Sequence, residues 1–195
     1  MGDGQCARHS RGHITVTNPN DGEPGSLREA IAAANDGDTI NFDAFVHGIT
    51  LLFGELVVDK RVTISGPDAK TFEVNAYDRS RVFHITNGVT VSISGLIIVN
   101  GQADERGGGI LNDHSTLTVS NCTIYNNNVG YDLGGGSCND GSFGSANEIN
   151  NSTDIRGGGI YKWLPIALVR RPTKHVFPVF MVGVAVGDSR DDFGR

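Results

Sequence analysis

A short alternating motif recurs through the middle of the chain and restricts the folds open to it. It reads Val62-Thr-Ile-Ser-Gly66, Val91-Ser-Ile-Ser-Gly95 and Leu117-Thr-Val-Ser-Asn121, with starting points 29 and 26 positions apart. A second motif, Gly107-Gly-Gly-Ile110, returns as Gly157-Gly-Gly-Ile160, which is 50 positions later and therefore two repeats of about 25. Self-similarity at a period in the twenties is typical of solenoids.

The composition of the repeats selects one class of solenoid. A leucine-rich repeat needs regularly spaced Leu and a helical half, whereas these repeats contain short alternating segments separated by Gly and Asn. Three short strands per turn predict an all-β fold, a right-handed parallel β-helix over residues 14–161. The alternation places one side chain in two inside, and the expected interior columns contain Val62, Ile64, Val91, Ile93, Leu117 and Val119. The Asn residues expected at or near corners, with left-handed backbone and laddered amides, are Asn87, Asn112, Asn121 and Asn126.

One α-helix is predicted ahead of the repeats, at about residues 26–35. Ser26-Leu-Arg-Glu29 has the spacing of a capping box, in which the Ser hydroxyl accepts from the Glu amide and the carboxylate reaches back. Leu27, Ile31 and Ala34 share one face, and Gly37 follows where helices usually end. Because the first coil of a β-helix exposes apolar side chains and unpaired backbone, we expect this helix to cap it.

The ends of the chain lack the repeat pattern. We interpret residues 1–13 as a disordered leader, without the apolar core of a signal peptide. Residues 162–195 are either a divergent C-terminal cap or a foreign tail. The apolar run 176–187 is short and contains Pro178, so no membrane-spanning segment is predicted. The three cysteines have neither the spacing of a zinc site nor an even number for a disulfide framework.

Two parts of the sequence resemble a known family. Gly25-Ser-Leu-Arg-Glu-Ala-Ile31, followed by Asn35-Asp-Gly-Asp-Thr-Ile40, is similar to the CSLREA domain of secreted and surface bacterial β-helix proteins. Gly107-Gly-Gly-Ile110 and Leu117-Thr-Val-Ser-Asn-Cys-Thr-Ile-Tyr-Asn126 resemble the repeats of polymorphic outer-membrane proteins and of the wider pectin-lyase-like superfamily. The resemblance covers about residues 14–161 and implies a secreted or cell-surface location. One position departs from it, because Gly25 stands where the family usually has Cys.

The resemblance implies a fold more than an activity, since that superfamily includes lyases, hydrolases, adhesins and scaffolds. Enzymes on this fold use clustered carboxylates, with calcium and a basic residue in lyases and paired acids in glycosidases. The candidate catalytic residues here are Asp104, Glu105, Arg106, Asp113 and His114. Each group also fits a polar surface turn, and we favour that interpretation.

No cofactor is predicted, and calcium stays open as a ligand of the acidic groups. The segment 134–141, Gly-Gly-Gly-Ser-Cys-Asn-Asp-Gly, resembles a calcium-binding nonapeptide repeat but departs from it at the fourth position. A net charge of −6 argues against a protein that follows nucleic-acid phosphates.

The sequence therefore predicts a non-catalytic extracellular or cell-surface β-helix module that binds a glycan or another cell-surface macromolecule. The alternative is a carbohydrate-active enzyme, a polysaccharide lyase or a glycoside hydrolase. Self-association through open coil ends is a further expectation, because unpaired strand edges can accept another chain.

Overall fold

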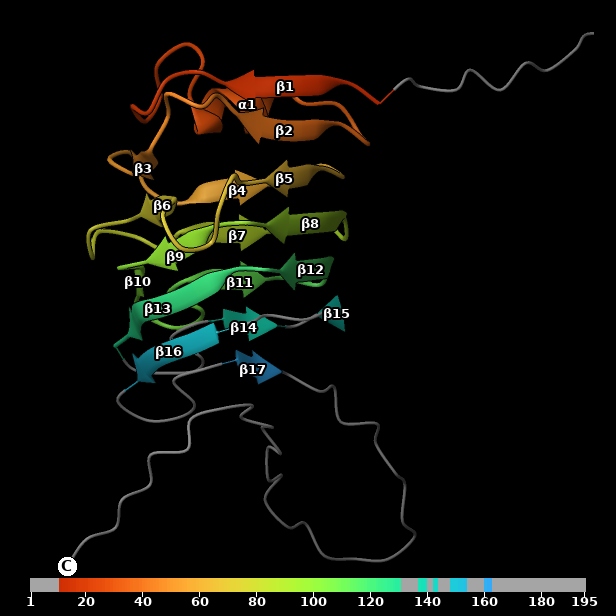
Figure 1. Cartoon of the computed structure of the whole chain (residues 1–195). Helices are drawn as coiled ribbons and strands as arrows, with labels where there is room; N and C mark the ends of the chain where they lie inside the picture. The colour runs from red at the N-terminus through yellow and green to blue at the C-terminus, as the bar shows by residue number, and fades with distance from the viewer. Residues whose placement is uncertain (1–10, 131–136, 140–141, 144–147, 154–159, 163–195) are drawn as a thin grey trace, which may run out of the picture.

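The protein is described by a computed structural model that covers residues 11–130, 137–139, 142–143, 148–153 and 160–162. The chain winds through three sheets, and successive coils add a strand to each of them, except that one coil contributes both β9 and β10 to sheet B (Figure 1). Sheet A contains β1 (His13–Val16), β2 (Thr39–Phe42), β5 (Thr63–Ser65), β8 (Thr90–Ser94), β12 (Thr116–Ser120) and β15 (Ser142–Phe143). Sheet B contains β3 (Gly48–Thr50), β6 (Glu73–Asn75), β9 (Ile97–Val99), β10 (Gln102–Ala103), β13 (Thr123–Val129) and β16 (Glu148–Thr153). Sheet C contains β4 (Leu56–Val58), β7 (Phe83–Ile85), β11 (Ile110–Asn112), β14 (Ser137–Asn139) and β17 (Ile160–Lys162).

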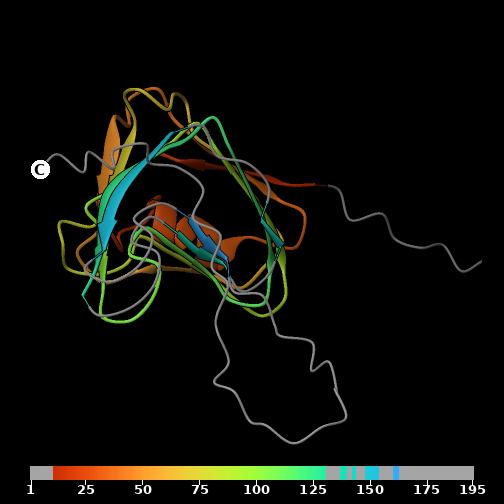
Figure 2. The same ribbon diagram turned by 90° about the horizontal axis from the view of Figure 1, so that it is seen from below.

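Neighbouring strands in all three sheets are parallel, as the stacking of coils requires. Seen along the stack, the coils superpose as a rough triangle (Figure 2). These observations confirm the predicted all-β parallel β-helix.

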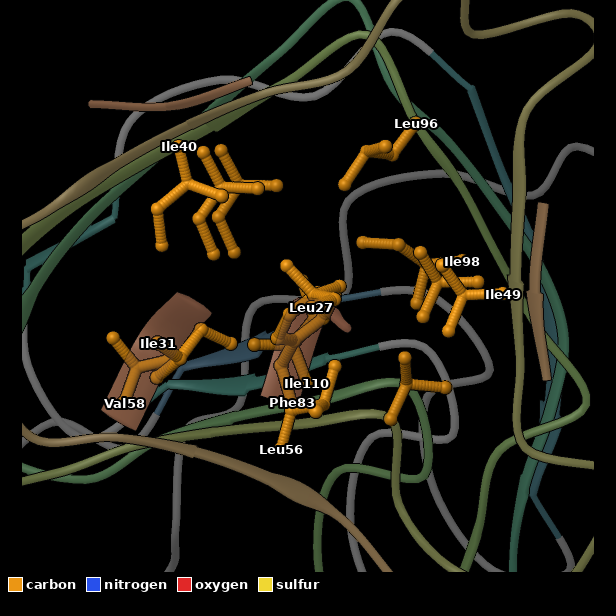
Figure 3. Packing of buried hydrophobic residues seen from close by; sticks show 14 of the residues in the cluster. Leu27, Ile31, Ile40, Ile49, Leu56, Val58, Phe83, Leu96, Ile98 and Ile110 are labelled. Carbon is orange, nitrogen blue, oxygen red and sulfur yellow. The ribbon is translucent and has the colours of Figure 1, made fainter. Parts of the chain in front are cut away.

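The predicted interior columns are present. Ile64 lies in register with Ile93, and Ile93 with Val119, so that three coils contribute one stacked column. Leu117 likewise lies in register with Val91. The side chains of all these residues are fully buried. The interior is therefore built from apolar, mostly aliphatic side chains that repeat once per coil (Figure 3).

The helix α1 (Leu27–Ala33) covers the mouth of the first coil, as predicted. Its buried face consists of Leu27, Ala30 and Ile31. Leu27 lies over the column of Leu56, Phe83 and Ile110, whereas Ile31 lies beside Val58 (Figure 3). The first coil therefore presents its apolar end to the helix and not to water.

The capping box forms at the start of α1. The Ser26 hydroxyl accepts a hydrogen bond from the Glu29 amide at 3.2 Å, and the Glu29 carboxylate accepts one from the Gly25 amide. The helix is shorter than predicted, because Ala34 adopts an extended backbone and the Asn35 amide donates to the Asp38 carboxylate instead of a helical carbonyl. The end of the helix is therefore set by the hydrogen bond to Asp38, and not by a glycine C-cap at Gly37.

Three of the four Asn residues predicted at or near corners have left-handed backbone. Asn87, Asn121 and Asn126 have φ values of 64°, 47° and 52°, in the region that Asn tolerates. Asn112 also lies beside a corner, as the last residue of β11, but without left-handed backbone; it is fully buried, and its amide donates to the Ser115 carbonyl at 3.0 Å. In that turn the left-handed residue is His114, with φ 54°.

An amide ladder connects three coils at the end of sheet B, with partly different members from those predicted. The Asn100 amide donates to the Asn75 side-chain oxygen at 3.1 Å, and the Asn126 amide donates to that of Asn100. The predicted leader, residues 1–13, and the predicted cap or tail, residues 162–195, lie largely outside the described residues. The described exceptions are Arg11 and Gly12, His13 at the start of β1, and Lys162 at the end of β17.

Candidate functional site

The outer surface of sheet A carries columns of hydroxyl groups. The strands alternate, so that Ile and Val point inward while Thr and Ser point outward. In the first column Thr39, Thr63, Ser92 and Thr118 succeed one another in register. A second column contains Ser65, Ser94 and Ser120, two residues further along each strand. Hydroxyls therefore repeat about every 4.8 Å across the coils and about every 6.7 Å along a strand.

A hollow of about 380 Å³ opens at the beginning of this face. It is lined by Thr39, Thr63 and Ser92 of the first column, by Thr90, and by the arginines Arg11 and Arg61. Because Arg61 precedes β5 and Arg11 precedes β1 by two residues each, both guanidinium groups belong to the edge where the strands of sheet A start.

Two of the candidate catalytic residues, Asp104 and Glu105, line a different hollow of about 390 Å³. This hollow also contains Glu55 and Arg81 and lies where the chain passes from sheet B to sheet C. Both acidic side chains are exposed. Arg106, the third member of the predicted group, contributes its backbone carbonyl, which accepts from Arg81 at 2.9 Å.

Arg81 organises this hollow. Its guanidinium donates to the Glu55 carboxylate in the preceding coil and to the carbonyls of Arg106 and Gly107 in the following coil, the last at 2.8 Å. Nδ1 of His84 lies 3.0 Å from Oε1 of Glu55. One carboxylate therefore connects an arginine and a histidine.

These contacts determine the charge of Glu55. The hydrogen bond from His84, together with the charges of Arg81 and His84, holds the pKa of the Glu55 carboxyl below its ordinary value, although burial alone would raise it. A carboxyl with a lowered pKa is ionised at neutral pH and is a poor general acid. The Arg81 guanidinium group donates to Glu55 and to backbone carbonyls, so it is engaged in structural hydrogen bonds, unlike an arginine that serves as the catalytic base of a lyase.

The remaining candidates, Asp113 and His114, occupy the turn that follows β11. Nδ1 of His114 lies 2.6 Å from Oδ1 of Asp113, and 74% of the His114 side chain is exposed. Arg106 and Gly107 precede β11 whereas Asp113 follows it, so the two predicted groups lie at opposite ends of this strand. The hollow that contains Asp104 and Glu105 includes neither Asp113 nor His114.

Sequence reasoning missed Glu55 and Arg81, although a signal for them exists. They are 26 positions apart, and Arg81 and Gly107 are again 26 apart, which equals one coil. Residues separated by about one period in a β-helix lie in neighbouring coils, so this spacing makes the three candidates for a contact, although coils of unequal length prevent it from fixing one.

Within the described part of the chain, no group of three or more His, Cys, Asp or Glu side chains could hold a metal ion. The glycine-rich segment 134–141 lies largely outside it. Among the described residues none forms a helix with the length and apolar character needed to traverse a bilayer.

Comparison with known proteins gave no match to a family model, to a curated protein or to a solved structure. The structure therefore supports the fold that the resemblance implied, a parallel β-helix, and does not identify a family.

Proposed function

We propose that this chain is a non-catalytic extracellular or cell-surface module that binds glycans through sheet A. The observation that carries the proposal is the set of outward hydroxyl columns on that sheet, which continue in register over four coils. Sugar hydroxyls need partners that both donate and accept, and Ser and Thr side chains do both. The resemblance to the CSLREA domain supports the extracellular location.

The arrangement of titratable groups also favours binding over catalysis. A glycosidase needs one protonated and one ionised carboxyl on either side of the scissile bond. Here Glu55 is held in its ionised form, Asp104 follows β10 whereas Asp113 follows β11, and the hollow that contains Asp104 does not include Asp113.

The test is a titration of the protein with neutral and charged oligosaccharides, read by calorimetry. The triple variant Thr39→Val, Thr63→Val, Ser92→Ala removes three of the four hydroxyls of the first column with little change of volume. We expect its affinity to fall at least about tenfold, since each lost neutral hydrogen bond contributes about 1 kcal/mol. Thr50→Val, on the outer face of β3 in sheet B, is the matched control and should bind like the wild type. Equal affinity of the triple variant and the control would refute binding through sheet A.

A second candidate, a polysaccharide lyase or glycoside hydrolase, is favoured by one observation. Asp104 and Glu105 share a hollow with Glu55, which itself contacts His84. Incubation with uronate and xylan polymers, with and without calcium, tests it. New unsaturated or reducing ends that disappear in Asp104→Asn would establish catalysis there, and ends that disappear in Asp113→Ala would place it at the turn after β11.

A further inference from the structure

The hollow at the beginning of sheet A differs in charge from the rest of this acidic protein. Arg11 and Arg61 contribute two positive charges to it and Asp36 one negative charge, whereas the chain as a whole carries −6. A local positive surplus on an acidic molecule attracts an anionic ligand to that place and disfavours it elsewhere.

The two guanidinium groups are available to a ligand. Arg11 is exposed, and the structure records no hydrogen bond or ion pair of its side chain with any described residue. The guanidinium group of Arg61 has one recorded partner among the described residues, the Asp36 carboxylate at 3.9 Å, which also accepts from the Arg61 backbone amide at 2.9 Å. Both side chains are more than 60% exposed, at 65% and 63%. Such a distant and solvated pair contributes little and yields readily to a closer anion.

Hydroxyl groups stand beside these charges. Thr63 follows Arg61 by two residues, and it lies in register with Thr39 on one side and Ser92 on the other. The hollow thus combines guanidinium groups, which bind oxyanions, with a row of Ser and Thr hydroxyls, which bind the hydroxyl groups of a sugar. Its volume of about 380 Å³ is at the small end of ligand sites, which suits one or two sugar units.

We infer that this hollow binds an anionic sugar unit, with a sulfate or carboxylate group at Arg11 and Arg61 and the ring hydroxyls along Thr39, Thr63 and Ser92. The inference rests on the proposed glycan-binding function and specifies its ligand. A neutral glycan engages the hydroxyl columns alone, whereas an anionic one gains charge-assisted hydrogen bonds at the edge of the sheet.

The experiment compares oligosaccharides that share a backbone and differ only in charge. One pair is a sulfated oligosaccharide and its desulfated form, and the other is an oligouronate and its methyl ester. We expect each charged member to bind at least about tenfold more tightly than its neutral counterpart, with an advantage that falls as salt is raised. The two pairs distinguish sulfate from carboxylate.

The variants Arg11→Gln and Arg61→Gln should each reduce the affinity for the charged member about three- to tenfold and leave that for the neutral member unchanged. Arg79→Gln is the matched control, because Arg79 is an exposed arginine at the corner after β6, away from sheet A. Thermal unfolding of each variant checks that the fold is intact.

The outcomes separate the two proposals. Neutral and charged members that bind equally would overturn this inference and leave glycan binding standing, whereas the absence of binding to any glycan would overturn both. An equal loss in Arg79→Gln would also overturn the inference, since the attraction would then come from charge anywhere on the surface.

Discussion

Besides the apolar packing of α1, an ion pair between Asp21 and Arg28 helps to hold the N-terminal cap to the first coil. The Asp21 side chain is only 1% exposed, and it accepts from Nε of Arg28 at 2.7 Å and from the amides of Leu52 and Phe53 at 2.7 and 2.9 Å. Arg28 also donates to the carbonyls of Gly54 and Glu55 at 2.7 and 2.8 Å. A residue of α1 thus anchors the segment that leads into β4.

Replacing Arg28 by Met keeps most of the side-chain volume and removes these donors. Removal of one partner of a buried ion pair typically costs 3–5 kcal/mol. We expect a smaller loss, about 2–3 kcal/mol of unfolding free energy, because 26% of the Arg28 side chain is exposed and Asp21 keeps its two amide donors. Urea unfolding measures this loss, and hydrogen exchange should show that it is concentrated in the amides of α1 and β1.

The same pair gives a dependence on pH. Burial by itself would raise the pKa of Asp21, but the hydrogen bonds from Arg28, Phe53 and Leu52 outweigh it and lower the pKa of the carboxyl. A lowered pKa in the folded state gives stability that is complete above the unfolded value of about 3.9 and is lost as the pH falls toward the folded value. The loss of stability between pH 5 and pH 2 should therefore be smaller in Arg28→Met than in the wild type.

Arg79→Met serves as the control, since Arg79 is exposed and its side chain has no recorded partner among the described residues. If Arg28→Met and Arg79→Met unfold at the same urea concentration, the Asp21–Arg28 pair does not stabilise the cap and the reasoning fails.

Three further substitutions test other parts of the fold, each by urea unfolding. Gly66→Ala should lower the free energy of unfolding by about 3 kcal/mol or more, because the new Cβ would lie 2.3 Å from the Gly95 carbonyl oxygen. Gly88→Ala should lower it by only about 1 kcal/mol, for the positive φ, because its Cβ meets nothing closer than 3.9 Å. Equal losses in the two variants would contradict this reasoning. Asn100→Ala removes the middle of the amide ladder at φ 52° and should cost about 2 kcal/mol, of which Asn100→Gly should recover the conformational part. Ile93→Ala should cost about 3–4 kcal/mol, since Ile93 is fully buried between Ile64 and Val119, and a loss below about 1 kcal/mol would show that the column is not packed as described.

The fold could be predicted because two periods can be read directly in the sequence, the alternation of two residues within a strand and the repeat of one coil. Alternation within a strand identifies the inward residues, and a repeat of about 26 residues identifies which of them stack. The column of Ile64, Ile93 and Val119 could therefore be predicted from the sequence. The capping box at Ser26 is legible for the same reason, since its members are three residues apart.

The surface sites were harder to predict because the corners differ in length. The step from Val62 to Val91 is 29 residues and that from Val91 to Leu117 is 26. Outward neighbours therefore cannot be assigned until the path of each corner is known. Asp21 and Arg28 are seven residues apart across a turn, and no periodicity brings them together. Asn112 does lie beside a corner, but its side chain is buried and its amide donates across the turn to the Ser115 carbonyl, which the pattern of Asn residues did not indicate.

Arg81 has a mechanical consequence. Its guanidinium group links the coil that precedes it, through Glu55, with the coil that follows it, through Arg106 and Gly107. Tension applied along the stacking axis would load this side chain in parallel with the strand ladders of sheet C. Unravelling that starts at the cap should accordingly pause at β7, and a single-molecule extension trace should record that pause as a separate step.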